Sequence, residues 1–565
     1  MNVKIRFASL LMLFACLTAC GQEQGRQMQQ TASSALEGEW VGGFQIGEIS
    51  GYLRFDIVAE GEQLQIVLDT VSPGSPQGSA LRDLNHDESV VRFVLTLGTE
   101  VFPFEGQLQG DSFAGMVRSG VQEGSFDLVR PRSQAQYDPA FFGRYEGAYE
   151  IAPNQLIFVR RHDYLSPQAP YGFDLTRLFY MDESGNRRFL YPSSDNTFFA
   201  GPTTFIPTPI EHTLEFVSNV EGEVIGIRWR DRGEPERFVP RATVYRDEEV
   251  RFRNGDVDLA GRLTVPEGRG PHPAIVLVHG WGHRTRNAEY LIVADVFARH
   301  GIAALVYDKR GTGGSEGDWQ QTSISDHADD ALAAVRLLQG RSDIDPGQVG
   351  IFTTSFGGLV TPLAASRSKD VAFLILTASP AISQAERHPY IMLPTLRALG
   401  WSEKELEEAV AFMKLEAEFL MTRSNWPKLR EAIERARGTI WFPRTRTGEA
   451  SATTEDHPFW KCAQCDIRQL NGRYDPRPAL RQLTCPLLAI FGELDEAVTL
   501  DPNRSVLEQM LREGEHPDFT IRVLPNAGHG MGFREGTSIA ARKRYAPGYL
   551  DTMISWLLER VEVNR

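Results

Sequence analysis

The sequence predicts an α/β protein whose mostly parallel sheet is preceded by two β-rich modules. Two observations carry this prediction. From residue 250 onward, continuous apolar runs of strand length alternate with stretches of helical spacing, which is typical of parallel strands buried on both faces. Before that point, polar and apolar residues alternate with period two between turn signals, which is typical of antiparallel strands.

Length and charge set outer limits on what this chain does. Its 565 residues predict roughly two to four domains, and its apolar and charged fractions are ordinary for a globular protein. The formal net charge of −15 argues against a nucleic-acid partner. Because the acidic residues are spread along the chain, they indicate solubility and no particular substrate.

The N-terminus predicts export. Lys4 and Arg6 precede an apolar stretch at 7–17, which has the length of a signal-peptide core and is too short to span a bilayer. No other stretch of the sequence is long and apolar enough to span one. We therefore expect a signal peptide at 1–19.

The end of that stretch predicts a lipid anchor. It reads LTACG at 17–21, which resembles the lipobox of bacterial lipoproteins. The resemblance implies cleavage before Cys20, lipidation of Cys20, and attachment to a membrane of the bacterial envelope, facing the periplasm or the cell surface. The polar, Gln-rich residues within 20–35 indicate a flexible tether. The alternative is an ordinary secretory signal in which the cysteine stands by chance.

Cysteine usage predicts a local staple. Past Cys20 the sequence holds Cys462, Cys465 and Cys485, which are too few for a disulfide scaffold. An exported chain meets an oxidising compartment, so we expect a structural disulfide between Cys462 and Cys465. A zinc site would need two more ligands, and no second pair has the spacing. A redox motif would follow a strand, and none precedes this pair.

Residues 36–135 and 138–245 are the two β-rich modules. In the first, a strand is predicted at 53–57 and a hairpin that turns at 110–111. In the second, paired strands are predicted on either side of 221–222. Neither module shows a cluster of catalytic residue types, so we expect spacers, docking surfaces or walls of a substrate entrance.

The two modules share an opening and a closing pattern. GEWVGGF at 38–44 is answered by GRYEGAY at 143–149, and FDLVR at 126–130 by FVPR at 238–241. A duplication explains this echo. Chance recurrence of strand-opening chemistry explains it equally well, and the sequence leaves both interpretations open.

Residues 250–565 form the α/β region. It opens with a strand at 259–266, and helical spacing recurs at 290–299 and 325–338. Further strands are predicted at 274–278, 302–307, 349–352, 373–377 and 486–491. This alternation of strands and helices predicts the parallel sheet.

Ser355 is the residue around which this region is organised. It follows the strand at 349–352 on a tight turn, ahead of a stretch able to start a helix, so its hydroxyl is expected above the sheet edge. Gly357 is small enough to let that helix pack close to the strand. Thr353 stands where such turns usually have glycine, so the G-x-S-x-G pattern is only partly met.

Other strands are also followed by motifs rich in polar residues and glycine. These motifs are HGWG at 279–282, DKRGTGGS at 308–315, GELDEAV at 492–498 and AGHG at 527–530. Along the chain, Ser355 is thus followed by Asp495 and then by His529, each on a loop after a strand.

That order resembles the α/β-hydrolase superfamily. Within it, the segments at 279–281 and 307–315 are similar to those of bacterial serine esterases and related aminopeptidases. The resemblance covers residues 250–565 and implies an α/β-hydrolase fold. It also implies that the backbone N–H groups of Trp281 and Phe356 form the oxyanion hole.

The chemistry of acyl transfer explains this set of residues. A serine hydroxyl is a weak nucleophile at neutral pH and needs a base within hydrogen-bond reach, which His529 would supply. Asp495 would orient the imidazole and stabilise its cation, and Glu493 on the same loop is an alternative acid. The donors of the oxyanion hole must already be in position when the oxyanion forms. Losing one donor typically costs about 3–4 kcal/mol of transition-state stabilisation.

An insertion at about 380–480 separates two of the predicted strands. Ser402 and Glu405 form a capping box, after which apolar residues recur at helical spacing. The insertion resembles the helical cap of many α/β hydrolases. Its large aromatic residues line an acyl or aryl pocket or form the core of the cap, and both interpretations stay open. They are Trp426, Trp441, Phe442 and Trp460.

The sequence therefore predicts an exported, lipid-anchored serine hydrolase that cleaves carboxylic esters through an acyl-enzyme. It implies no metal or organic cofactor, a small-molecule ester as substrate, and contact with a membrane through the anchor. One alternative is an aminopeptidase or oligopeptidase of the same fold. Another is a non-catalytic lipoprotein whose β modules bind a partner.

Overall fold

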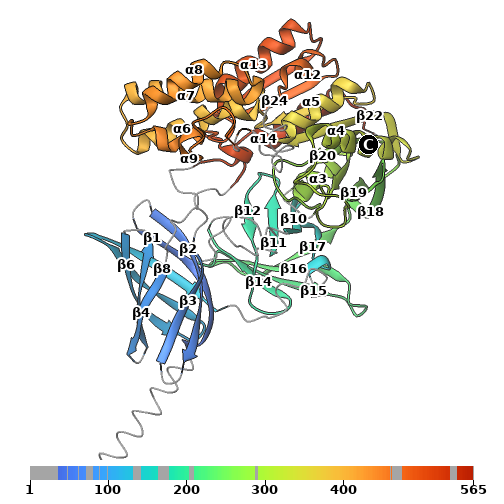
Figure 1. Cartoon of the computed structure of the whole chain (residues 1–565). Coiled ribbons are helices and arrows are strands. Elements are labelled where there is room, and N and C mark those ends of the chain that lie inside the picture. The colour runs from blue at the N-terminus through green and yellow to red at the C-terminus, as the bar shows by residue number, and fades with distance from the viewer. Residues whose placement is uncertain are drawn as a thin grey trace, which may run out of the picture.

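The computed structural model describes residues 36–46, 49–60, 63–71, 80–87, 89–97, 100–130, 142–162, 177–202, 209–286, 290–457, 460, 474–534 and 544–563. Within them the chain forms three sheets, two in the β-rich N-terminal part and one in the C-terminal part (Figure 1). No helix in these ranges is both long and apolar enough to cross a membrane. Cys20, Cys462 and Cys465 lie outside the described residues.

The first β-rich module forms an eight-stranded antiparallel sheet in the order β3-β2-β1-β8-β7-β6-β5-β4. Its strands are β1 (Gly38–Ile46), β2 (Ile49–Glu60), β3 (Gln63–Val71), β4 (Ala80–Asp87), β5 (Val90–Leu97), β6 (Glu100–Gln109), β7 (Ser112–Ser119) and β8 (Gln122–Val129). β3 and β4, the two ends of that order, contact each other, so the sheet curls around its own interior. The predicted hairpin turn at 110–111 is confirmed, because β6 and β7 flank it.

The second module forms a nine-stranded sheet in the order β12-β11-β10-β9-β17-β16-β15-β14-β13. Its strands are β9 (Gly147–Ala152), β10 (Gln155–His162), β11 (Arg177–Asp182), β12 (Arg187–Phe189), β13 (Tyr191–Pro192), β14 (Thr197–Ala200), β15 (His212–Ser218), β16 (Val224–Asp231) and β17 (Arg237–Ala242). In both modules the opening strand pairs with the closing strand, as Phe44 with Phe126 and Tyr149 with Arg241 illustrate. The similar sequences at the start and end of each module thus lie at or next to the first and last strands, which pair with each other.

The third sheet runs in the order β18-β19-β21-β20-β22-β23-β24-β25. Neighbours from β21 to β25 pair in parallel, whereas β18 and β19 form an antiparallel hairpin at one edge. The strands are β18 (Tyr245–Asn254), β19 (Val257–Pro266), β20 (His272–Val278), β21 (Ala303–Tyr307), β22 (Ile344–Thr354), β23 (Leu374–Thr377), β24 (Leu487–Gly492) and β25 (Phe519–Leu524). The predicted start of this region at residue 250 is too late, since β18 begins at Tyr245. The alternating charged residues of β18 resemble those of the preceding module, so the sequence does not mark the boundary.

Helices cover both faces of this sheet, which explains its continuous apolar strands. Ile275 and Leu277 pack with α3 (Tyr290–Arg299) and α14 (Tyr549–Leu558) on one face. Val276 and Val278 pack with the helices of the other face. Those helices are α4 (Ile324–Gln339), α5 (Gly357–Arg367) and α13 (Leu500–Glu513).

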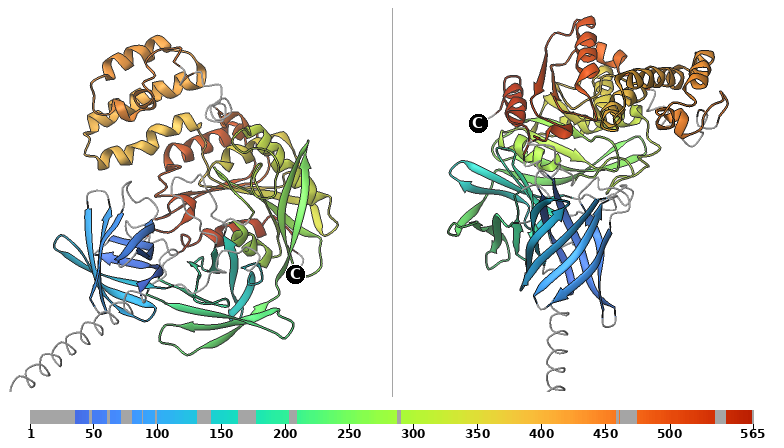
Figure 2. Two further views of the ribbon diagram at one scale, coloured as in Figure 1. Left: turned by 60° about the horizontal axis from the view of Figure 1, so that its bottom comes forward. Right: turned by 90° about the vertical axis from the view of Figure 1, so that its left-hand side faces the viewer.

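The insertion between β23 and β24 is helical and gathers on one side of the sheet (Figure 2). It contains α6 (Gln384–Ala398), α7 (Glu403–Thr422), α8 (Trp426–Ala436), η2 (Phe442–Arg444) and α9 (Arg446–Glu449). The predicted capping box is present, since the Ser402 and Glu405 side chains bond each other's backbone N–H at the start of α7. Trp441 and Trp460 are buried in the core of the insertion, so these two aromatic residues hold the cap together.

The second sheet and the third sheet share one apolar core. Phe158 and Phe179 of the second sheet lie in the same buried cluster as Leu291 and Phe297 of α3 and Tyr549 of α14. The second module is therefore packed onto one helical face of the C-terminal domain.

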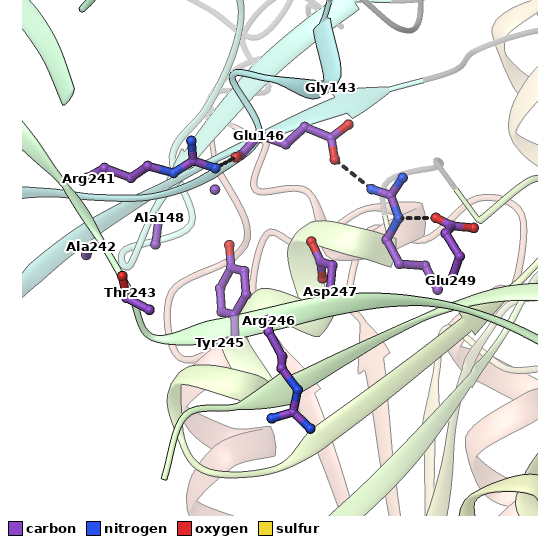
Figure 3. A pocket seen from close by; sticks show the side chains of 12 residues that line it. Gly143, Glu146, Ala148, Arg241, Ala242, Thr243, Tyr245, Arg246, Asp247 and Glu249 are labelled. Carbon is purple, nitrogen blue, oxygen red and sulfur yellow. Dashed lines mark hydrogen bonds and ion pairs between the residues drawn. The ribbon is translucent and has the colours of Figure 1, made fainter. Parts of the chain in front are cut away.

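Buried charges reinforce that junction. Arg160 on β10 is fully buried, and its Nε donates to both carboxylate oxygens of Asp295 on α3, at 3.0 and 2.8 Å. It also donates to Asp247 on β18 at 2.5 Å. A cavity of about 470 Å³ lies beside β18 and is lined by Glu146 and Asp247, whose side chains Figure 3 shows. Glu146 accepts from Arg262 at 2.6 Å. The charged pairs thus tie a strand of the second sheet, β10, to a strand of the third sheet, β18, and to the helix α3.

Candidate active site

Ser355 lies on a strained turn between β22 and α5. Its φ of +57° is in the left-handed region, which non-glycine residues rarely adopt. Its N–H donates to the carbonyl of Thr377 on β23 at 3.1 Å, and its own carbonyl accepts from Gly358 at 2.8 Å. The sheet and the helix therefore hold the turn from both ends, as the sequence predicted for a strand-to-helix elbow.

The unusual Thr353 is accommodated by the neighbouring strand. It is completely buried, and its hydroxyl donates to the carbonyl of Val278 on β20 at 2.8 Å. A Cβ on residue 357 would overlap Thr353 Oγ1, so Gly357 is required by the side chain that replaces the usual glycine. The departure from the G-x-S-x-G pattern leaves the turn intact.

His529 lies between a hydroxyl and a carboxylate, at the start of η4 (His529–Met531). Its Nδ1 is 3.0 Å from each carboxylate oxygen of Asp495, and its Nε2 is 3.1 Å from Ser355 Oγ. An ionised carboxylate only accepts hydrogen bonds, so Nδ1 carries the proton and donates. Nε2 is then free to accept the proton of the Ser355 hydroxyl.

The two acidic residues on the loop after β24 have different hydrogen-bond partners. Asp495 is nearly completely buried, and its Oδ1 also accepts from the N–H groups of Ala497 at 2.9 Å and Val498 at 2.8 Å. Glu493 accepts instead from the N–H of Asn526 at 2.9 Å, on the loop that leads to His529. Asp495 is thus the acid that meets the imidazole, while Glu493 ties the two loops together.

Both predicted oxyanion donors belong to segments that approach Ser355, because Phe356 follows it in the chain and a Cβ on Gly280, next to Trp281, would lie 3.4 Å from Ser355 Cβ. Neither the N–H of Trp281 nor that of Phe356 donates to an acceptor within the described part of the chain. Their rings meet edge to face at 5.1 Å, and Phe356 stands at the N-cap of α5. Two N–H groups without an acceptor in the described residues therefore lie on the segments next to Ser355.

The neighbouring polar residues brace these loops. His279 donates through Nε2 to the carbonyl of Tyr307 at 2.9 Å, and burial lowers its pKa to about 3, so it stays neutral. Asp308 pairs with Arg286. Arg310 pairs with Asp330 at 2.6 Å. Each residue holds a loop with a partner of its own.

The loop that carries His529 also rests on the second β sheet. The N–H of Tyr545 donates to the carbonyl of Gly185 at 2.9 Å, in the turn between β11 and β12. The next residue, Ala546, donates to the carbonyl of Met531 at 2.8 Å, two residues after His529. The sequence does not reveal this link, because no local pattern relates a β turn to a segment that lies some 360 residues later in the chain.

No three His, Cys, Asp or Glu side chains come together as a metal site would need, as far as the described residues go. Cys485 is a free cysteine, and burial raises the pKa of its thiol to about 11.

This combination of sheet, strained turn and Ser, His and Asp loops is typical of the α/β-hydrolase fold. Residues 275–541 match the alpha/beta hydrolase family. The C-terminal part of the chain therefore has the α/β-hydrolase fold and is related to esterases of that superfamily.

Particular relatives match shorter or longer parts of the chain. It is 27% identical over 327 residues to the esterase EstD of Thermotoga maritima, a match that covers 56% of this chain and 68% of EstD. It is 36% identical over 121 residues to the quorum-quenching protein AidA of Acinetobacter baumannii, which covers 21% of this chain and 38% of AidA. The solved structure of DcsB in complex with its substrate analogue is 18% identical, with a TM-score of 0.36, over 56% of this chain and 99% of that one.

Proposed function

We propose that this protein is a serine hydrolase that cleaves small-molecule carboxylic esters through a Ser355–His529–Asp495 triad. One observation carries the proposal, namely the continuous hydrogen-bonded path from Ser355 Oγ to His529 at 3.1 Å and on to Asp495 at 3.0 Å. The relationship to EstD, an esterase, supports esters as the substrate class.

The geometry supports the following course of reaction. Ser355 Oγ attacks the acyl carbon while its proton passes to His529 Nε2, and Asp495 stabilises the imidazolium. The N–H groups of Trp281 and Phe356 stabilise the oxyanion. The alcohol then leaves with the proton from Nε2, and a water activated by the same nitrogen cleaves the acyl-enzyme and restores Ser355.

The nucleophile is tested by labelling. A fluorophosphonate is expected to modify Ser355, and Ser355→Ala should abolish both the labelling and the turnover of p-nitrophenyl esters. Circular dichroism and the melting temperature control for folding of the variant. Labelling or turnover that survives in folded Ser355→Ala protein would rule out this nucleophile.

The acid is tested by a matched pair of variants on one loop. Asp495→Asn should lower kcat by orders of magnitude, because the amide favours the wrong imidazole tautomer, and in a comparable triad the loss is about 10⁴-fold. KM should change much less, since the lost contact supports the transition state. Glu493→Gln should have a mild effect, because Glu493 bonds Asn526 and not His529. Reversed outcomes in folded protein would assign the acid to Glu493.

A panel of esters and aminoacyl arylamides separates an esterase from an aminopeptidase. An aminopeptidase would need carboxylates in the cap to hold the substrate amine. Glu416 is buried in the cap, but its Oε1 accepts from the N–H of Thr447 at 2.5 Å and from its hydroxyl at 2.6 Å. That carboxylate already has partners within the cap, and the similarity to EstD, an esterase, favours esters as the better substrates. Preferential turnover of arylamides would favour the aminopeptidase, and no turnover of either class would favour a partner-binding lipoprotein.

We also propose that the protein is exported and anchored by a lipid on Cys20, because of the lipobox-like run at 17–21. Mass spectrometry of the natural N-terminus is expected to find lipidated Cys20. An unmodified Cys20 or cleavage at another residue would refute the anchor.

The pair Cys462 and Cys465 is proposed to be a structural disulfide. Replacing both with serine should lower the melting temperature modestly and leave ester turnover near normal. Loss of activity in a folded double variant would contradict that assignment.

A further inference from the structure

Lys309 is a buried lysine that has no carboxylate partner in the described part of the chain. It follows β21 in the DKRGTGGS motif and is only 5% exposed. Its ammonium makes one hydrogen bond, to the carbonyl of Gly280 at 2.9 Å. A buried ammonium without a counter-ion is costly, and a lysine kept under those conditions indicates a use beyond packing.

The carbonyl that Lys309 binds belongs to the peptide whose N–H is the first oxyanion donor. Gly280 and Trp281 share a trans peptide, in which the C=O and the N–H lie in one plane and point in opposite directions. Holding the oxygen of Gly280 therefore fixes the direction in which the N–H of Trp281 points. A hydrogen bond to the carbonyl also polarises the amide and strengthens its N–H as a donor.

The same ammonium faces the second donor. Lys309 Nζ lies 5.1 Å from the centre of the Phe356 ring, within the range of a cation–π contact. Gly280 in turn approaches the nucleophile, since a Cβ at that position would lie 3.4 Å from Ser355 Cβ. One positive charge thus touches both segments that supply an N–H beside Ser355.

We propose that Lys309 is a positioning residue for the oxyanion hole. Its ammonium holds the Gly280–Trp281 peptide and the Phe356 ring so that both N–H groups face the reacting carbonyl oxygen, and its charge adds to the field that stabilises the oxyanion. This inference rests on the proposed ester hydrolysis at Ser355.

The groups around the ammonium keep a constant charge near neutral pH. Burial and the neighbouring cations keep the pKa of His279 on the oxyanion loop at about 3 and that of His327 on α4 well below its usual range, so both are neutral. Arg284, on the loop after β20, donates to the carbonyl of Trp281 at 3.2 Å. Among His279, His327 and Lys309, Lys309 is the one whose pKa lies near neutral pH.

Because burying the charge of Lys309 costs stability, the melting temperature distinguishes a positioning lysine from one that stabilises the fold. Burial, with the charge of Arg284 as a smaller cause, lowers the pKa of Lys309 from 10.5 to about 7. Between these values the unfolded chain binds a proton that the folded chain does not, so stability rises with pH, and the cost is greatest at and below pH 7. Above pH 7 the neutral amine still donates to Gly280. Removing Lys309 is therefore expected to leave the melting temperature at pH 7 unchanged or higher.

Lys309→Met in the full chain tests the proposal, because methionine keeps the unbranched length and removes the charge and the donor. We expect kcat for a p-nitrophenyl ester to fall about 10- to 100-fold, less than for complete loss of an oxyanion donor. KM should change by less than about threefold. The inhibition constant of a trifluoromethyl ketone, whose adduct with Ser355 carries an oxyanion, should rise by the same factor as kcat falls. Lys404→Met, at an exposed lysine on α7, is the matched control and should change none of these values.

Several results would overturn the proposal. These are a folded Lys309→Met protein with unchanged kcat and unchanged ketone inhibition, a rise in KM alone, or a loss of kcat that follows a fall in melting temperature. Lys309→Gln, which retains an N–H donor without the charge, serves if the methionine variant does not fold, and it should lie between wild type and the values above. The proposed function fails separately, if Ser355→Ala keeps turnover.

Discussion

The two β-rich modules pair their strands in the same way but differ in how they pack against the C-terminal domain. In both, the first strand pairs with the last. The first module closes its apolar residues into a core of its own, where Phe93 stacks on Phe104 at 4.6 Å and meets the rings of Phe55 and Phe113. Of its buried residues, Val41 joins the core of the C-terminal domain.

The second module divides its apolar residues between two cores. One face, with Tyr149 and Trp229, builds an internal cluster. The other face, with Phe158 and Phe179, packs on the helices of the hydrolase. Arg160 adds a buried ion pair with Asp295 across that boundary. The second module thus packs on the C-terminal domain because its second face is apolar and charge-matched. The first module keeps most of its buried residues in a core of its own.

Deletion of one or both modules should have the largest effect on folding and turnover. A chain beginning near residue 140, without the first module, is expected to fold and to keep ester turnover within about threefold, because few buried contacts are lost. A chain beginning near residue 245 should be insoluble or inactive, because an apolar helical face becomes exposed. Soluble yield and kcat measure both outcomes, and equal behaviour of the two deletions would contradict the distinction.

Arg160→Met tests the buried ion pair. It leaves Asp295 buried without its cation, so stability should fall by about 3–5 kcal/mol, with loss of turnover at moderate temperature. Adding Asp295→Leu should restore part of the stability. The control is Arg92→Met in the first module, where the ion pair with Glu105 is exposed and should matter by less than about 1 kcal/mol. Urea unfolding followed by activity assays measures the difference, and similar losses would contradict it.

Gly185→Ala tests whether the second module supports the loop of His529. Its φ is +78°, and a Cβ there would lie 3.1 Å from Tyr545 Cβ, so the segment bonded to Met531 should shift slightly. We expect kcat to fall about three- to tenfold with KM nearly unchanged, since small misplacements of catalytic groups are costly. Gly222→Ala is the control, because it carries a similar φ of +85° in open space. Both variants should lose about 1 kcal/mol of stability, and equal kcat values would refute the support.

Phe93→Ala should have the smallest effect on turnover. The lost ring contacts should destabilise the first module by about 3–5 kcal/mol. Because that core is closed, ester hydrolysis is expected to continue at temperatures where the first module has melted. Differential scanning calorimetry paired with activity at each temperature measures this, and joint loss would show that the modules depend on each other.

The sequence by itself determined much of the local structure. Apolar runs and helical spacing located α3 at its observed bounds, and Ser402 with Glu405 located the start of α7. The order of Ser355, Asp495 and His529 on loops after strands predicted which side chains the structure brings together. These features follow from periodicity, capping and turn chemistry, which act between residues close in the chain.

Long-range packing distinguishes residues that look equivalent in the sequence. Glu493 and Asp495 are two residues apart, and the position of His529 distinguishes them. The sequence suits Trp441 and Trp460 equally to a pocket and to a core, and the packing of the cap places both in its core. Lys309 reads as part of a charged loop, and its contact with the carbonyl of Gly280 exists because two strand ends meet at one edge of the sheet. Such choices depend on contacts between residues far apart in sequence, which leave no period or spacing to read.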